Sequence, residues 1–169
     1  PGALAFKASF TSPHPTAKSD VEAGALRLRG QLPGYAGRRD LKTVEQWGDQ
    51  HKYPENYGAD GRRKPNAAQV LYGADIDGKG MFFEARLEVK TDGKVSGGGA
   101  LLQVAGATEA VLLVSAASSF NGYDQSPSRA GVEPALRTTR DLRAAAVRSY
   151  GELRARHEAD YRALFDRVS

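Results

Sequence analysis

Short runs in which apolar and polar residues alternate are the feature that most constrains the fold of this chain. The clearest run covers residues 80–90, with apolar side chains at 83, 85, 87 and 89 and charged ones between them. Similar runs cover residues 3–10 and 24–32. A period of two is typical of strands that bury one face. Since turn signals separate these runs, the sequence predicts a mainly β protein, an antiparallel β-sandwich.

The connections between these strands can also be predicted. We expect the runs at 3–10 and 24–32 to pair as antiparallel neighbours. Asp92-Gly93, directly after the clearest run, indicates a hairpin turn. Residues 111–114 are continuously apolar, which predicts a central strand covered on both faces.

A long excursion interrupts the predicted sandwich domain, residues 1–136. Residues 33–66 are rich in Gly, Pro, Asp and Asn and carry Trp47, Tyr53 and Tyr57. One interpretation is that these aromatic side chains fix the loop to the domain. The alternative is that they form an exposed platform for sugar rings, which would make the chain an independent carbohydrate-binding module.

The C-terminal part, residues 137–169, is expected to be a helical linker segment. Thr138 and Asp141 form one candidate capping pair, and Ser149 with Glu152 forms a capping box. From Tyr150 to Val168, apolar residues recur every three or four positions, which predicts an amphipathic helix. Its apolar stripe needs a surface, either this sandwich or a part of the protein outside the chain.

Composition excludes several classes of site and partner. The 169 residues include no Cys and three His, so thiolate sites and disulfides are excluded, and we expect no metal or other cofactor. The net charge is +4, but arginines alternate with acids near the C-terminus, and no nucleic-acid-binding motif occurs. No apolar run approaches the roughly 18–20 residues of a membrane helix. We therefore expect neither a nucleic acid nor a membrane as partner. Because the chain starts at Pro1 without Met, we expect the natural N-terminus to lie outside it.

Few residues are candidates for chemistry. Glu84 and Glu88 share one strand face and could form a glycosidase-type acid pair, although a solvated face bridged by Arg86 is the favoured interpretation. Asn121 and Asp124 lie in a loop after a predicted strand, where they could contact a substrate or simply stabilise the turn. We predict no self-contained active site and no catalytic residue.

Several segments together resemble a known family. Residues 80–87 (GMFFEARL), 109–124 and 157–168, in this order, resemble the α-L-fucosidases of glycoside hydrolase family ninety-five. Tyr53-Pro54-Glu55 and residues 69–73 (QVLYG) are similar to one bacterial branch of that family. The resemblance covers nearly the whole chain.

The resemblance implies that the chain is a fragment: part of an N-terminal β super-sandwich and the start of a helical linker. In that family the catalytic groups lie in a following (α/α)₆ barrel, and hydrolysis proceeds with inversion. It implies the barrel of the same parent as a partner, a fucosylated or galactosylated oligosaccharide as substrate, and a periplasmic or secreted location. Asn121, Asp124 and Trp47 are the candidate substrate-binding residues, with no catalytic residue in this chain.

Overall fold

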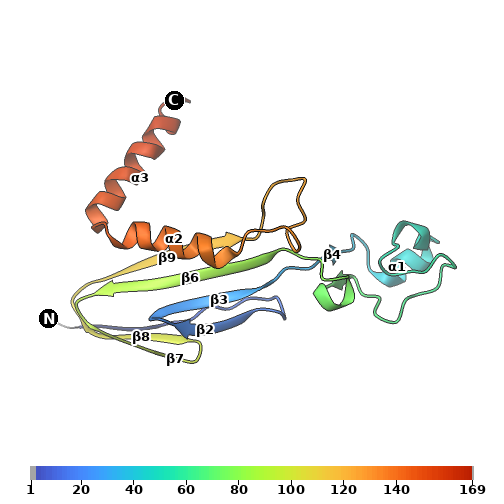
Figure 1. Ribbon diagram of the computed structural model, residues 1–169, viewed down its shortest axis with the longest axis horizontal. Coiled ribbons are helices and arrows are strands. Elements are labelled where there is room, and N and C mark those ends of the chain that lie inside the picture. The colour runs from blue at the N-terminus through green and yellow to red at the C-terminus, as the bar shows by residue number, and fades with distance from the viewer. Residues whose placement is uncertain (1–2, 169) are drawn as a thin grey trace.

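The computed structural model describes residues 3–168, which form a two-layer β-sandwich followed by two helices (Figure 1). The strands are β1 (Leu4–Ala8), β2 (Lys18–Glu22), β3 (Ala25–Gln31), β4 (Tyr35–Ala36), β5 (Val70–Leu71), β6 (Phe82–Thr91), β7 (Lys94–Gly98), β8 (Leu101–Ala107) and β9 (Ala110–Ser118). The helices are α1 (Leu41–Gln46), α2 (Pro134–Ala146) and α3 (Tyr150–Phe165), with 3₁₀ turns at Gln50–Lys52 and Gly73–Asp75. The predicted fold class, an antiparallel sandwich with a C-terminal helical segment, is confirmed.

Two antiparallel sheets make the sandwich. One has the strand order β2-β3-β6-β9 and the other has the order β1-β8-β7. Leu26 and Leu87 are direct neighbours in the first sheet and pack against Leu102 of the second. All three side chains are buried. The alternation in the sequence therefore reflects one apolar face per sheet turned towards a shared core.

Two predicted strand connections are wrong. β1 pairs with β8, so it lies in a different sheet from β3. Asp92-Gly93 is not a hairpin turn, because β6 pairs with β3 and β9 whereas β7 pairs with β8. The turn instead carries the chain from one sheet to the other. Turn residues indicate a change of direction but do not determine which strand the chain joins next.

The Asp92 carboxylate ties this crossover to the second crossover, between β8 and β9. It accepts hydrogen bonds from the backbone N–H groups of Thr108 (2.9 Å) and Glu109 (3.2 Å) and from the Thr108 hydroxyl. These donors, with the Thr108 hydroxyl contributing most, lower the pKa of Asp92 to about 2.

β9 is an edge strand, so the prediction of a central strand covered on both faces is wrong. Leu112 and Val114 pair with Val89 and Leu87 and thus point to the inner face, yet they are 46% and 59% exposed. The three-stranded sheet does not cover them, since β7 and β8 make their main contacts across the sandwich with β2, β3 and β6 rather than with β9. Only the outer face of β9 is covered, where α2 packs on the strand and Leu113 is buried. One side of the sandwich is therefore open.

The helix α2 begins at Pro134, where the Glu133 carboxylate accepts from the Ala135 N–H. Proline suits this position because its missing N–H would have no partner in the first turn. Thr138 is thus not a cap but lies inside the helix, fully buried against the sheet. Leu142, one turn later on the same face, is also buried.

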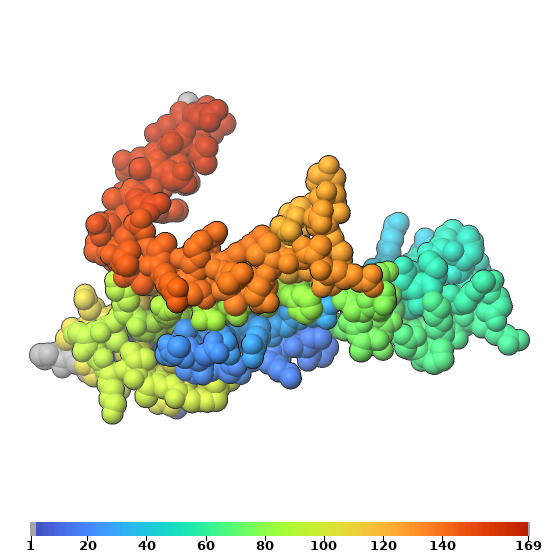
Figure 2. All heavy atoms as spheres, viewed as in Figure 1, coloured from blue at the N-terminus to red at the C-terminus, as the bar shows by residue number. Residues whose placement is uncertain are grey.

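The capping box of α3 is confirmed: the Ser149 hydroxyl accepts from the Glu152 N–H, and the Glu152 carboxylate accepts from the Ser149 N–H. None of the residues of α3 is buried, and the helix stands clear of the sandwich (Figure 2). Tyr161 and Phe165 stack with ring centroids 5.2 Å apart, and both are 53% exposed. The predicted helix is therefore present and these two rings share one side of it, but the helix as a whole is only weakly amphipathic. Its apolar side chains have no surface to lie on within the described chain.

The excursion that contains residues 33–66 extends from one end of the sandwich (Figure 1). It contains β4 and α1, and β4 pairs with β5. Val44, Tyr57 and Leu71 are buried within this segment.

Candidate functional site

The aromatic platform required by a carbohydrate-binding module is not formed. Trp47 is 59% exposed, but Tyr57 is only 3% exposed. The Tyr57 hydroxyl donates to the backbone carbonyl of Leu41 (3.3 Å) or to the Glu45 carboxylate (3.2 Å). Tyr57 therefore ties two parts of the excursion to each other, whereas the first interpretation expected it to fix the loop to the domain.

Trp47, the candidate sugar contact, is covered in part by another residue of the excursion. The Arg39 guanidinium lies 4.2 Å from the centre of the indole ring and forms an ion pair with Asp49 (2.6 Å). This arrangement is a cation–π contact on a solvent-facing ring. A substrate contact by Trp47 stays a prediction.

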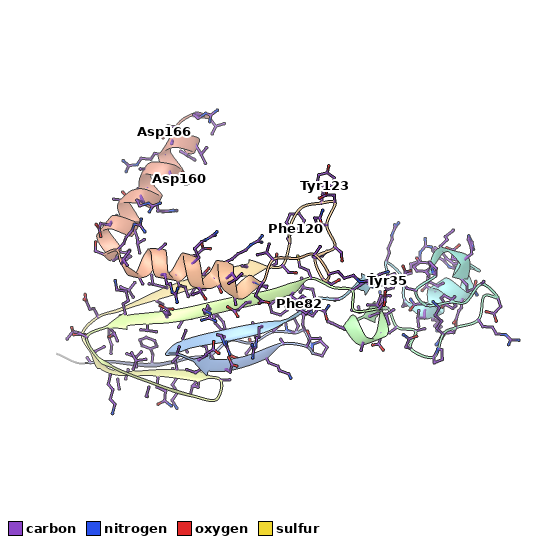
Figure 3. All side chains as sticks on the ribbon, in the orientation of Figure 1. Tyr35, Phe82, Phe120, Tyr123, Asp160 and Asp166 are labelled. Atoms are coloured by element: carbon purple, nitrogen blue, oxygen red, sulfur yellow. The ribbon has the colours of Figure 1, made fainter. Side chains whose placement is uncertain are left out.

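Asn121 and Asp124 lie in the loop between β9 and α2, which projects from the sandwich. Figure 3 shows this loop with the rings of Phe120 and Tyr123 on it. The Asn121 amide donates to the backbone carbonyl of Ala130 (3.0 Å), and the Asp124 carboxylate accepts from the Gln125 amide (3.3 Å). Asn121 thus closes the loop on itself. Among the exposed large hydrophobic side chains of the described residues, that of Tyr123 is the most exposed, at 99%. A substrate contact by Asn121 or Asp124 stays a prediction.

The Glu84 face of β6 is buried, contrary to the prediction of a solvated face. Glu84 is 4% exposed because α2 covers it. Its Oε1 accepts from the Thr138 hydroxyl (2.6 Å) and from the Arg86 Nε (2.9 Å). Arg86 also lies 3.5 Å from Glu22. The expected bridging by Arg86 is therefore present, but it satisfies a buried carboxylate.

Beside this face, β2 supplies acids that neutralise a second buried arginine. Arg27 is 7% exposed, donates to both carboxylate oxygens of Asp20 (2.8 Å each) and contacts Glu22. The hydrogen bond from Arg27 lowers the pKa of Asp20. No alternation of apolar and polar residues marks β2 in the sequence, because Val21 is its only large apolar residue. Asp20 and Glu22 lie two positions apart, as Arg27 and Arg29 do, and Asp20 pairs with Arg27 in the β2–β3 ladder. This matching spacing of opposite charges is the signal that could have indicated β2.

A cavity of about 430 Å³ lies between these charged strands and the first turn of α2. Lys18 and Arg29 lie on one wall, Glu133 and Pro134 on the other, and Glu84 and Phe82 also line it. Glu88 does not line this cavity, so Glu84 and Glu88 do not form the cleft that an acid pair would need.

Residues 3–168 hold no group of three or more His, Asp or Glu side chains arranged to bind a metal ion. Within the same residues, no helix is long and apolar enough to cross a membrane.

Fold and site geometry together define the class of this chain: an antiparallel β-sandwich domain with an open side and two appended helices. No protein-family profile matches it. Along its whole length, however, the chain is 32% identical over 173 residues to Alpha-L-fucosidase 2 of Arabidopsis thaliana. It spans 18% of the length of that curated relative. This similarity supports an α-L-fucosidase-like relationship.

Proposed function

We propose that the chain is an accessory N-terminal domain of an α-L-fucosidase-like enzyme of glycoside hydrolase family ninety-five. In this role it supports a catalytic (α/α)₆ barrel that lies elsewhere in the same polypeptide. The observation that carries the proposal is the similarity of the entire chain to less than a fifth of Alpha-L-fucosidase 2.

Two unpartnered surfaces support this role. The stripe of α3 exposes Leu164 and Phe165 at 62% and 53%, although nothing in the described chain covers them. The open side of the sandwich exposes Leu112 and Val114 of β9. Apolar surface gains free energy when it is removed from water, so both regions are suited to contact further parts of a larger protein.

The proposed chemistry is hydrolysis of a fucosylated or galactosylated oligosaccharide with inversion. Inversion needs two carboxyl groups roughly 6.5–9.5 Å apart with a water molecule between them. In the proposal, the barrel supplies that pair. The Glu84 carboxylate, held by Thr138 and Arg86 beneath α2, is not a member of that pair in the proposal.

The test is native gel filtration of the protein isolated from its source, with intact denatured mass and hydrolysis of a chromogenic α-L-fucoside measured across the peak. We expect this sequence within a polypeptide much larger than 18.1 kDa that releases fucose. A lone 18.1 kDa species without hydrolysis would contradict the proposal. With an active species, proton NMR of the first-formed anomer distinguishes inversion from retention.

A further inference from the structure

The cavity beside the first turn of α2 is lined by a carboxylate, one oxygen of which accepts no hydrogen bond from the described residues. Both hydrogen bonds to Glu84 end on Oε1, from Thr138 and Arg86. Within residues 3–168, no hydrogen bond ends on its second oxygen, Oε2, which protein atoms do not enclose, and Glu84 lines the cavity. A hydroxyl or N–H group entering the cavity can therefore donate to Oε2.

The same face of the sheet carries two cationic donors beside Glu84. Lys18 lies opposite Arg29 in the β2–β3 ladder, and Arg29 lies opposite Glu84 in the β3–β6 ladder. Among the described residues, Lys18 makes no ion pair or hydrogen bond, and Arg29 has only a long contact of 3.6 Å with Asp20. A hydroxyl group placed between these two cations can accept a hydrogen bond from each of them.

The cavity also offers apolar surface. The ring of Phe82 is 41% exposed at the first residue of β6, and Pro134 and Ala135 lie across from it. Figure 3 shows Phe82 at the same end of the sandwich as the projecting loop. An aromatic face of this kind suits a ring that presents C–H groups on one side.

We propose that this cavity binds a neutral pyranose residue. Hydroxyl groups both donate and accept, so one group of a sugar can donate to Glu84 Oε2 while others accept from Lys18 and Arg29. The ring then lies on Phe82. The lining carries three cationic side chains, Lys18, Arg27 and Arg29, and two carboxylates, Glu84 and Glu133. Because these charges nearly balance, a neutral ligand with both donors and acceptors suits the cavity. A volume of about 430 Å³ lies within the roughly 300–1,000 Å³ of small-molecule sites.

The site is separate from the barrel that the proposed function requires, and the inference rests on that function only for the choice of sugars. We therefore test L-fucose, D-galactose and a fucosylated disaccharide. The ¹H–¹⁵N correlation spectrum of the 169-residue chain is recorded during titration of each sugar at millimolar concentrations, because it reports folding and binding together. We expect saturable shifts of amide signals around Lys18, Arg29 and Glu84 with at least one sugar.

Two variants and their controls decide the assignment. Arg29→Gln removes a charged donor and is expected to weaken binding about tenfold, which is the effect of about 1.4 kcal/mol. Its control is Arg62→Gln, an exposed arginine of the excursion that does not line the cavity. Phe82→Ala removes the ring and is expected to weaken binding similarly, with Phe120→Ala as its control. If Phe82→Ala fails to fold, Arg29→Gln decides alone.

Three results would overturn the assignment. The first is the absence of saturable shifts with every sugar. The second is equal affinity of the Arg29→Gln variant and the original chain for the sugar. The third is stronger binding of free glycine than of any sugar, which would indicate a site for a zwitterion. None of these results bears on fucoside hydrolysis by the larger polypeptide. Likewise, an inactive larger polypeptide leaves the titration interpretable.

Discussion

Replacing Thr138 with valine tests whether the buried carboxylate of Glu84 holds α2 on the sheet. The change keeps the side-chain shape and removes the hydroxyl that donates to Glu84 Oε1 over 2.6 Å. Thr138 is 0% and Glu84 4% exposed, so water cannot readily replace the lost donor. A hydrogen bond to a charged group contributes about 1.5–3 kcal/mol. At roughly 2–4 °C per kcal/mol for a chain of this size, Tm should fall by roughly 3–12 °C.

The assay is urea unfolding followed by far-UV circular dichroism, with a thermal scan beside it. The matched control is Thr139→Val, the same change at the next position of α2, where the hydroxyl makes no hydrogen bond within the described residues. The control should stay within about 0.5 kcal/mol of the original chain. Equal stability of the two variants would refute the reasoning, because the Thr138 hydroxyl would then contribute nothing beyond helix propensity.

Further predictions concern other contacts of the fold. The pKa of Asp92 falls from its ordinary 3.8 to about 2 on folding. The ionised carboxylate therefore stabilises the fold fully above about pH 4, and this contribution is lost as the pH falls towards 2. When the free energy of unfolding is measured over this pH range, the Thr108→Val variant should lose less than the original chain. Leu142→Ala should cost about 2–5 kcal/mol in urea unfolding, since it leaves a cavity beneath α2; an unchanged midpoint would contradict this packing. Ending the chain after Ser149 should leave the unfolding midpoint unchanged, because α3 buries no residue; a clear loss of stability would show that α3 docks on the sandwich. Trp47→Ala should lower the free energy of unfolding by under about 1 kcal/mol, because the exposed ring makes a cation–π contact with Arg39. A larger loss in the same assay would place the ring in the core of the excursion.

The candidate site was only partly accessible to sequence reasoning. The sequence pointed to the Glu84 position and to a bridge by Arg86, because residues two apart on a strand share a face. It placed that face in water, since the pattern of charges does not reveal that α2 returns to cover it. The cavity depends on β2, whose single apolar residue gives no periodic signal, so its cations and acids could be brought together only in three dimensions.

Local interactions determined what the sequence predicted correctly. The alternation around Leu26 and Leu87 specifies strands, and Ser149 with Glu152 specifies the start of α3, since each signal acts within a few residues of the chain. Tertiary structure alone decided that Asp92 joins two sheets and that β9 lies at an edge. Strand order depends on contacts between segments far apart in sequence, and a turn or an apolar run can satisfy several such arrangements equally well.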